Sequence, residues 1–300
     1  MAGTFLRLLA ALLLAAATGL SARAADELTG TLKKAQASGT VTIGYRESSL
    51  PFSYLPGGAG QPIGYAIDLC REIVDDMSKA LGRDLAIRFE PVTSASRLDA
   101  VASGKVDLEC GSTTANAERR KVVDFSPVTF ISATKLMVKA GGPIKSYRDL
   151  GGKTVVVTEG TTNEEAVRAI AARLKMSVDI IKGRDHADSF QKLVSGEAQA
   201  LALDDVLLYG LRAAAGPAGN AYAILPSALS YEPYGIAFRK DDPQLADLVK
   251  ATFVRLAESR EAIWIYDRWF RRRLPTGERL NIPMSDELMH FWEMLGLPPD

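Results

Sequence analysis

The 300-residue sequence contains only two cysteines and two histidines, and it has no excess charge of either sign. Lys and Arg together number 36, as do Asp and Glu, so no basic surplus exists to neutralise a phosphate backbone, and no nucleic acid is expected as a partner. Two histidines are too few for a multi-histidine metal site, and no CxxC or Cys/His spacing typical of zinc occurs. The sequence therefore predicts no metal site.

Common catalytic signatures are also missing. There is no GxSxG elbow, no HExxH, no Walker loop and no GxGxxG after a predicted strand. Gly152-Lys153-Thr154 resembles the end of a phosphate loop but lacks the upstream glycine spacing, which favours a simple turn before a strand. We therefore predict no catalytic residues and no cofactor.

One long apolar run is present, at the N-terminus. Arg7 precedes the run from Leu8 to Leu20, and Ala22-Arg23-Ala24 forms a small-x-small cleavage site. The run is shorter than the roughly 20 residues that span a bilayer, so residues 1–24 are predicted to be a cleaved signal peptide. The mature chain would carry 34 basic and 36 acidic residues.

The two cysteines bear on the compartment. Cys70 lies far from the cleavage site, which excludes a lipid anchor on a cleavage-site cysteine. In an oxidising compartment Cys70 and Cys110 could form a disulfide, but two buried thiols are an equally good interpretation. The sequence leaves both open.

Strand and helix signals alternate, as in α/β proteins. The first half has predicted strands at 41–45, 85–90 and 106–109 and helices at 66–81 and 96–103; the second repeats this order with strands at 154–158, 178–181 and 198–203 and helices at 163–174 and 187–194. Extended segments at 130–139, 221–225 and 234–238 connect the halves and suggest a hinge. The C-terminal part begins with Asp242 and Pro243 as helix cap and first helical residue, and Trp264, Trp269 and Phe270 are expected to pack.

Small hydroxyl residues, single glycines and arginines gather where strands should end. They lie in four loops, at residues 45–49, 93–97, 110–114 and 159–163. Ligands of open α/β sheets bind at the carboxyl ends of the strands, where hydroxyls, free N–H groups and helix N-termini favour anions. The four loops together predict a site for a small acidic or zwitterionic ligand.

At these residues the chain resembles the periplasmic solute-binding proteins of polar amino-acid ABC transporters (solute-binding protein family 3), and within them the glutamate/aspartate-binding branch. The matching stretches run in order along the chain: Arg46-Glu47-Ser48-Ser49-Leu50-Pro51-Phe52-Ser53-Tyr54, Glu109-Cys110-Gly111-Ser112-Thr113-Thr114, Glu118-Arg119, Asp124-Phe125-Ser126, Val155-Val156-Val157-Thr158, Gly160-Thr161-Thr162, Asp185-His186, Asp188-Ser189-Phe190, Asp204-Asp205 and Arg239-Lys240-Asp241-Asp242-Pro243-Gln244.

The resemblance implies a two-lobed α/β clamshell, the periplasmic-binding-protein fold, in which each lobe is an open sheet flanked by helices and two hinge crossings join the lobes. Residues 26–135 and 229–300 would form the first lobe and residues 136–228 the second. The protein would be a periplasmic monomer that closes on L-glutamate or L-aspartate and delivers it to a membrane permease.

The resemblance also implies roles for individual residues. Arg119 would bind the ligand α-carboxylate, and Thr114 and Thr162 would bind the same carboxylate. Asp204 and Ser112 would accept hydrogen bonds from the α-ammonium group. The second carboxylate of the ligand would lie among four side chains, which are Arg46, Ser94, Arg97 and His186. Two arginines facing one pocket favour a dicarboxylic ligand, because each is costly when buried without an anion.

This chain differs from the branch at four positions. It has Tyr45 where the branch often has histidine, Ser96 where asparagine is usual, Glu159 where a small residue is expected, and Asn163 in place of serine. Glu159 is expected to be an exposed acid. A competing function is an enzyme like the cyclohexadienyl dehydratases, with Glu159 as a general acid. A binding protein for glutamine or another polar amino acid, and a sensor or chemoreceptor partner, would use the same fold.

Overall fold

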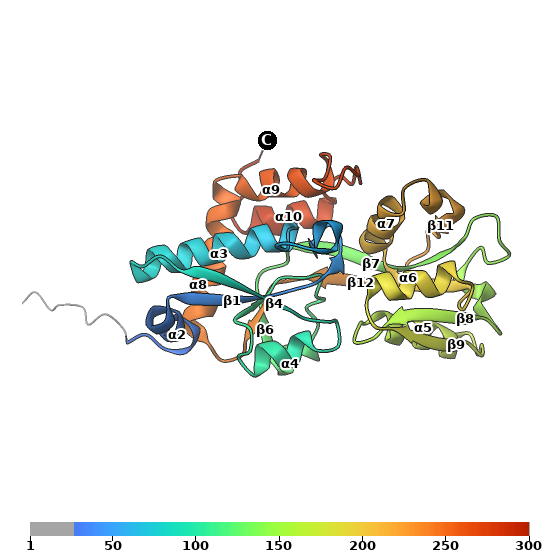
Figure 1. Cartoon of the computed structure of the whole chain (residues 1–300), viewed down its shortest axis with the longest axis horizontal. Helices are drawn as coiled ribbons and strands as arrows, with labels where there is room; N and C mark the ends of the chain where they lie inside the picture. Colours follow the sequence, from blue (N-terminus) through green and yellow to red (C-terminus); the bar gives the residue numbers. More distant parts are fainter. Residues whose placement is uncertain (1–26, 300) are drawn as a thin grey trace, which may run out of the picture.

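The computed structural model describes residues 27–299, which form two lobes lying side by side (Figure 1). Each lobe is a β-sheet with helices on its faces, and strands β7 (Phe130–Lys139) and β12 (Ser230–Tyr234) lie between the lobes. The predicted two-lobed α/β architecture is confirmed. The predicted signal peptide lies outside the described residues. Within residues 27–299, no helix combines the length and the apolar character needed to cross a bilayer.

The first sheet has the strand order β4-β1-β5-β13-β6. Strand β1 (Thr40–Tyr45) runs parallel to both β4 (Ala86–Pro91) and β5 (Leu108–Glu109). Strand β13 (Ala237–Arg239) comes from late in the chain and inserts antiparallel between β5 and β6 (Val123–Phe125). The C-terminal part of the chain is therefore built into the first lobe.

The other elements of this lobe cover the sheet. They are α2 (Gly30–Ser38), the short pair β2 (Ser48–Ser49) and β3 (Ser53–Tyr54), η1 (Pro56–Gly58), α3 (Tyr65–Leu81), α4 (Arg97–Ala102), η2 (Arg119–Lys121), α8 (Pro243–Glu258), α9 (Glu261–Phe270) and α10 (Asp286–Met294). As predicted, Asp242 caps α8: its carboxylate accepts a hydrogen bond from the backbone N–H of Leu245, and Pro243 is the first helical residue.

The second sheet has the order β11-β7-β10-β8-β9, with β12 also pairing with β7. Its other strands are β8 (Thr154–Thr158), β9 (Asp179–Gly183), β10 (Ala200–Asp204) and β11 (Tyr222–Ile224), and its helices are η3 (Tyr147–Leu150), α5 (Asn163–Arg173), α6 (His186–Val194), α7 (Asp205–Ala214) and η4 (Gly216–Ala221). Because β8, β9 and β10 are parallel, the loops that follow them meet at one edge of the sheet.

The return crossing differs from its prediction. Residues 234–238 were expected to form one extended segment, whereas the structure ends β12 at Tyr234 and begins β13 at Ala237. The two strands belong to different sheets because β12 pairs with β7 and β13 pairs with β5 and β6. The predicted lobe boundaries stay a prediction: residue 135 lies inside β7, and residue 229 lies just before β12.

An aromatic cluster packs the crossing strands against the first lobe. The Phe52 ring centroid lies 5.1 Å from those of Phe130 in β7 and Tyr234 in β12, and Phe270 of α9 stacks on Phe130 at 4.9 Å. These rings are almost fully buried, and aromatic pairs in this geometry add about 0.5–1.5 kcal/mol each beyond burial. The start of the hinge is thus held by the core of the first lobe.

One of the three aromatic residues predicted to pack does not. Trp269 and Phe270 are buried, but Trp264 is 72% exposed. The buried face of α9 contains Ala262, Tyr266, Trp269 and Phe270, at the spacing of one helix face. Trp264 lies on the opposite face, so the prediction that it packs is wrong.

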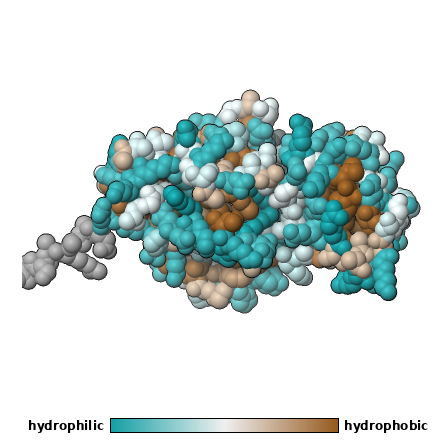
Figure 2. Space-filling model, turned by 90° about the horizontal axis from the view of Figure 1, so that it is seen from below, coloured by the Kyte–Doolittle hydropathy of each residue, from teal (hydrophilic) through white to brown (hydrophobic). Residues whose placement is uncertain are grey.

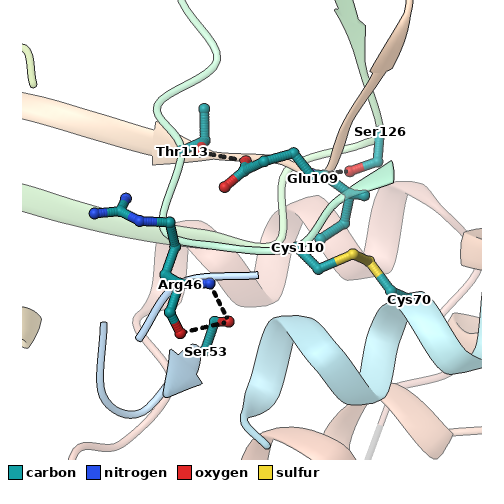
Figure 3. The surroundings of a disulfide bond; sticks show 8 residues. Arg46, Ser53, Cys70, Glu109, Cys110, Thr113 and Ser126 are labelled. Carbon is teal, nitrogen blue, oxygen red and sulfur yellow. Dashed lines mark hydrogen bonds between the residues drawn. A yellow bond between two sulfur atoms is a disulfide. The ribbon is translucent and has the colours of Figure 1, made fainter. Parts of the chain in front are cut away.

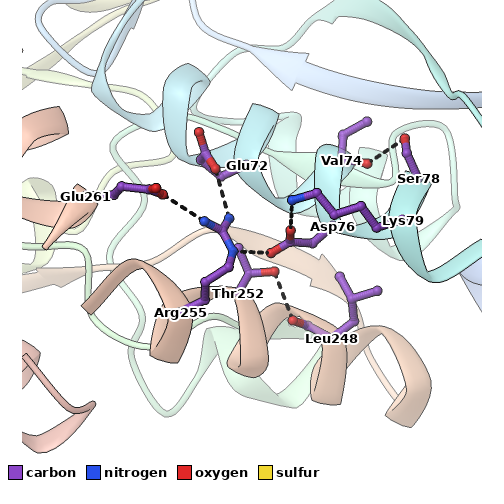
Figure 4. A network of polar contacts seen from close by, with 9 residues as sticks. All are labelled: Glu72, Val74, Asp76, Ser78, Lys79, Leu248, Thr252, Arg255 and Glu261. Atoms are coloured by element: carbon purple, nitrogen blue, oxygen red, sulfur yellow. Dashed lines mark hydrogen bonds and ion pairs between the residues drawn. The ribbon is translucent and has the colours of Figure 1, made fainter. Parts of the chain in front are cut away.

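A network of partly buried ion pairs links the helices α3, α8 and α9 (Figure 4). The Arg255 guanidinium donates to Asp76 at 2.8 Å, to Glu72 at 2.8 Å and to Glu261 at 2.7 Å. Burial lowers the pKa of Arg255, but its hydrogen bonds to Glu72 and Asp76 outweigh burial and raise the pKa above its usual value. One cation with three carboxylate partners is the kind of network in which surface charges do contribute to stability.

Cys70 of α3 and Cys110, directly after β5, form a disulfide (Figure 3). The structure therefore decides between the disulfide and the two buried thiols that the sequence left open. Their Cα atoms are 6.3 Å apart, within the usual range. The bond ties the start of the 110–114 loop, one of the four predicted ligand loops, to a helix of the first lobe.

The double variant Cys70→Ala/Cys110→Ala is expected to lose stability. The bond closes a loop with a sequence separation of 40, for which the chain-entropy model gives about 4 kcal/mol. Urea unfolding of both proteins measures the difference. Dithiothreitol should destabilise the wild type to a similar extent and leave the double variant unchanged; a loss below about 1 kcal/mol would contradict the prediction.

Candidate binding site

All nine predicted site residues lie at strand ends or helix starts between the lobes. Six come from the first lobe and three from the second: Arg46, Ser94, Arg97, Ser112, Thr114 and Arg119, then Thr162, His186 and Asp204. Seven of the nine are buried, Arg119 and Thr162 being only partly so. The site is therefore largely enclosed. The face of the molecule in Figure 2 is mostly hydrophilic, with apolar patches on the bodies of the two lobes.

Arg46, Arg97 and His186 form the cationic side of the site. Burial, followed by the charge of Arg97, lowers the pKa of Arg46 to about 9. Burial and both arginines lower the pKa of His186 well below its usual value, so its imidazole is neutral. Two guanidinium groups and an imidazole from both lobes thus face one another inside the protein.

Several polar atoms on this side are buried without a hydrogen-bond partner. They are Arg46 Nη1, Ser94 Oγ, Arg97 Nε and His186 Nε2, and Ser112 Oγ of the 110–114 loop is also buried without a partner. Arg97 Nη1 does donate to the Ser112 carbonyl, at 3.3 Å. Buried donors without partners cost about 1–3 kcal/mol each, so this cluster is arranged for a group that accepts hydrogen bonds, such as a carboxylate.

His186 is held by its other ring nitrogen. Nδ1 lies 3.0 Å from Thr158 Oγ1, which lies 2.8 Å from Ser189 Oγ. For Nε2 to donate to an anion, the neutral ring must carry its proton there and Nδ1 must accept from the Thr158 hydroxyl. Thr158 Oγ1 then offers only lone pairs to Ser189, whose hydroxyl also donates to the Asp185 carbonyl at 2.9 Å.

Arg119 bridges the two lobes. Its Nη1 donates to the Thr114 carbonyl of the first lobe at 2.9 Å, and its Nη2 donates to the Gly160 carbonyl of the second at 3.2 Å. Burial and the charge of Arg97 lower the pKa of Arg119 to about 10. These contacts use two of the five guanidinium N–H groups, which leaves others to bind an anion.

Asp204 forms the opposite, anionic side. Its carboxylate accepts a hydrogen bond from Asn163 at 2.7 Å and another from the Tyr234 hydroxyl. Burial and the nearby charge of Glu232 raise its pKa to about 7. Asn163, one of the departures from the family pattern, thus orients the predicted ammonium acceptor.

Three side chains of this side were not predicted from the sequence: Thr134, Glu232 and Tyr234. In the register of the sheet, Thr134 of β7 pairs with both Asp204 of β10 and Ser230 of β12. Residues 230, 232 and 234 alternate onto the face that carries Asp204. The alternation of polar residues at 230, 232 and 234 is visible in the sequence. That these residues lie at the site follows only from the pairing of β12 with β7.

The remaining departures lie away from these contacts. The Glu159 side chain is exposed, as expected, and so is Ser96, whose hydroxyl accepts from the Thr93 backbone N–H. Tyr45 packs edge-on against Phe89. Glu159 therefore does not lie among the buried side chains of the candidate site.

Close approach of the lobes depends on Gly160. Its φ is +76°, and a Cβ there would lie 2.5 Å from Ala95 Cα of the first lobe. Only glycine fits this backbone and this contact. The loops after β4 and β8 therefore touch directly, which encloses the site. Within residues 27–299 no cluster of His, Cys, Asp and Glu is suited to hold a metal ion.

Residues 41–272 match the family described as bacterial extracellular solute-binding proteins, family 3. The chain belongs to this family. It is 45% identical over 266 residues to the L-glutamate/L-aspartate-binding protein of Pseudomonas aeruginosa, covering 88% of each chain, and 40% identical over 280 residues to the glutamate/aspartate import solute-binding protein of Escherichia coli, covering 93% of this chain and 92% of the relative.

A solved structure agrees on the fold of this solute-binding family. An ancestral amino acid-binding protein, a precursor of cyclohexadienyl dehydratase, is 30% identical with a TM-score of 0.68, covering 81% of this chain and 100% of its own. The fold therefore occurs in a lineage that leads to an enzyme, so fold alone does not define function. The argument for a function therefore rests on the buried side chains of the site.

Arg97→Met is expected to stabilise the ligand-free protein by about 1–3 kcal/mol, because it removes a buried charge that has a like charge beside it and an unpartnered N–H. Urea unfolding measures this. Arg255→Met is the matched control: it removes the centre of a paired network and should destabilise by about 1–2 kcal/mol. Destabilisation by both variants would contradict the prediction.

Proposed function

We propose that this protein is the periplasmic substrate-binding component of an ABC importer for acidic amino acids, L-glutamate or L-aspartate. The observation that carries the proposal is the pair Arg46 and Arg97, buried together with unpartnered guanidinium N–H groups and joined by His186 from the other lobe. The charge of buried Glu109 partly offsets that of Arg46, but neither arginine forms an ion pair within the described residues. A neutral ligand side chain would leave both without one, whereas a carboxylate pairs with both. The names of the relatives from Pseudomonas and Escherichia support the same ligand class.

The charge distribution of the site matches an acidic amino acid along its length. At one end, Arg46, Arg97 and His186 would bind the side-chain carboxylate, with the Ser94 hydroxyl. Arg119 would hold the α-carboxylate, assisted by Thr114 and by Thr162, which lies at the positive N-terminal end of α5. Asp204 would accept from the α-ammonium, with Ser112 beside it.

Closure and recognition are coupled in this proposal. The first lobe contributes the arginines, and the second contributes Thr162, His186 and Asp204, so only the closed arrangement uses both sets. A ligand that contacts both lobes shifts the population toward closure. The membrane permease would recognise the closed form, and the predicted signal peptide would direct the chain to the periplasm.

A dehydratase function is less well supported. Asp204, with Asn163 and Tyr234 orienting it, is an acceptor suited to an ammonium group, which prephenate lacks. The candidate general acid Glu159 has an exposed side chain. A binding role without turnover fits these two observations better.

Thermal unfolding of the refolded mature chain with single ligands tests the proposal. Glutamate or aspartate at about 100 times its dissociation constant should add about 2.7 kcal/mol, or about 5–10 °C. Arg97→Met should abolish this shift, because it removes a buried charged partner worth about 2–5 kcal/mol. A shift with glutamine or arginine but with neither acidic amino acid would contradict the acidic ligand, and turnover of prephenate would contradict the binding role.

Affinity for the acidic amino acid should rise with pH. Asp204 has a pKa of about 7 in the ligand-free protein, and only its ionised form pairs with an ammonium group. About one tenth is ionised at pH 6, so the dissociation constant should be about tenfold higher at pH 6 than at pH 8. Isothermal titration calorimetry at both values measures it; equal constants would show that Asp204 does not contact the ammonium group.

A further inference from the structure

Glu232 of β12 is a buried carboxylate that lies between the lobes. It is 2% exposed. Its Oε2 accepts from Thr114 Oγ1 of the first lobe at 2.8 Å and from Thr162 Oγ1 of the second at 2.6 Å. Its Oε1 accepts from Thr134 Oγ1 at 3.2 Å and from Ser230 Oγ at 2.5 Å. Four hydroxyl groups thus donate to one carboxylate.

These contacts constrain what Thr114 and Thr162 can do. A hydroxyl has one hydrogen and two lone pairs. When its hydrogen is donated to Glu232, only lone pairs remain for any other partner. Both threonine hydroxyls are then acceptors toward a ligand, and an acceptor next to Asp204 is suited to a cation.

We propose that Glu232 is a positioning residue of the α-ammonium subsite: by taking the hydroxyl hydrogens of Thr114 and Thr162, it makes both oxygens acceptors and selects ligands that carry an α-amino group. The inference rests on the proposed function. In the proposed function the two hydroxyls donate to the α-carboxylate; here they instead accept from the α-ammonium group. The α-carboxylate is then held by Arg119 and backbone N–H groups.

Glu232 also acts on the ionisation of Asp204. The groups that face Asp204 are Glu232 and Tyr234 of β12, Asn163 of α5 and Asp205 of α7, with Arg119 of η2 near enough to feel its charge. After burial, the charge of Glu232 is the main cause of the raised pKa of Asp204. An ammonium group between the two carboxylates would relieve this repulsion, so the pair discriminates against ligands that lack it.

The test compares ligands that differ only in the amino group. Dissociation constants of L-glutamate and glutarate, and of L-aspartate and succinate, are measured by calorimetry for wild type and Glu232→Gln. The amide introduced by this substitution keeps one accepting oxygen and replaces the other with a donating NH2 group. It can no longer accept from all four hydroxyls, so the variant should bind the amino acids about 10–100-fold more weakly. It should bind the desamino ligands within about threefold of wild type.

The pH profile gives a second readout that a purely structural role would not change. Removing the charge of Glu232 should lower the pKa of Asp204, so the tenfold change in affinity between pH 6 and pH 8 should flatten in Glu232→Gln. Glu197→Gln is the matched control, because Glu197 pairs with Lys192 at the C-terminal end of α6, opposite the end that carries His186; it should leave affinity, ligand ratio and pH profile unchanged.

The outcomes separate the two proposals. If the wild type binds neither L-glutamate nor L-aspartate, the proposed function fails. If it binds them and Glu232→Gln weakens both members of each ligand pair equally, or neither, the inference about Glu232 alone fails. Should Glu232→Gln not fold, Thr114→Val removes one of the two acceptor hydroxyls and must show the same selective loss of the amino acids; an equal loss of both ligand classes overturns the inference.

Discussion

Burial of Arg46 beside Arg97 is the constraint on which the rest of the site depends. Two like charges removed from water without partners destabilise a fold, and the neighbouring unpartnered hydroxyls and imidazole nitrogen add to that cost. Such a cluster persists only where the surrounding structure holds it in place. Here the sheet edge, the start of α4 and the disulfide hold it, and the proposed anionic ligand would relieve the repulsion between the two arginines.

The strands between the lobes give the site its polarity. Strands β7 and β12 are packed by aromatic rings of the first lobe, yet their hydrogen bonds belong to the second sheet. The alternation of β12 brings Glu232 and Tyr234 to the face of Asp204. Arg46 and Arg97 with His186 thus form one group of the site, and Asp204 and Glu232 form another, with Arg119 acted on by the charges of Arg97, Glu232 and Asp204.

The disulfide and the glycines position these groups against one another. Cys110 begins the loop that carries Ser112 and Thr114, and its bond to Cys70 fixes that loop to α3. Gly111 leaves room for the Arg46 and Glu109 side chains, since a Cβ there would lie 2.8 Å from Arg46 Cγ. Gly160 does the same for the contact between lobes. Backbone fit thus decides how closely the two halves of the site meet.

The sequence by itself determined the alternating α/β elements and the four polar loops that supply the candidate site, because hydrophobic periodicity, capping residues and local loop composition are short-range signals. It did not determine the pairing of Cys70 with Cys110, the exposure of Trp264 or the presence of Glu232. Each depends on which face of a helix meets a neighbour, or which strand lies beside which. Glu232 is about 118 residues from Thr114 and 70 from Thr162 along the chain, so only tertiary structure could bring its carboxylate to both hydroxyls.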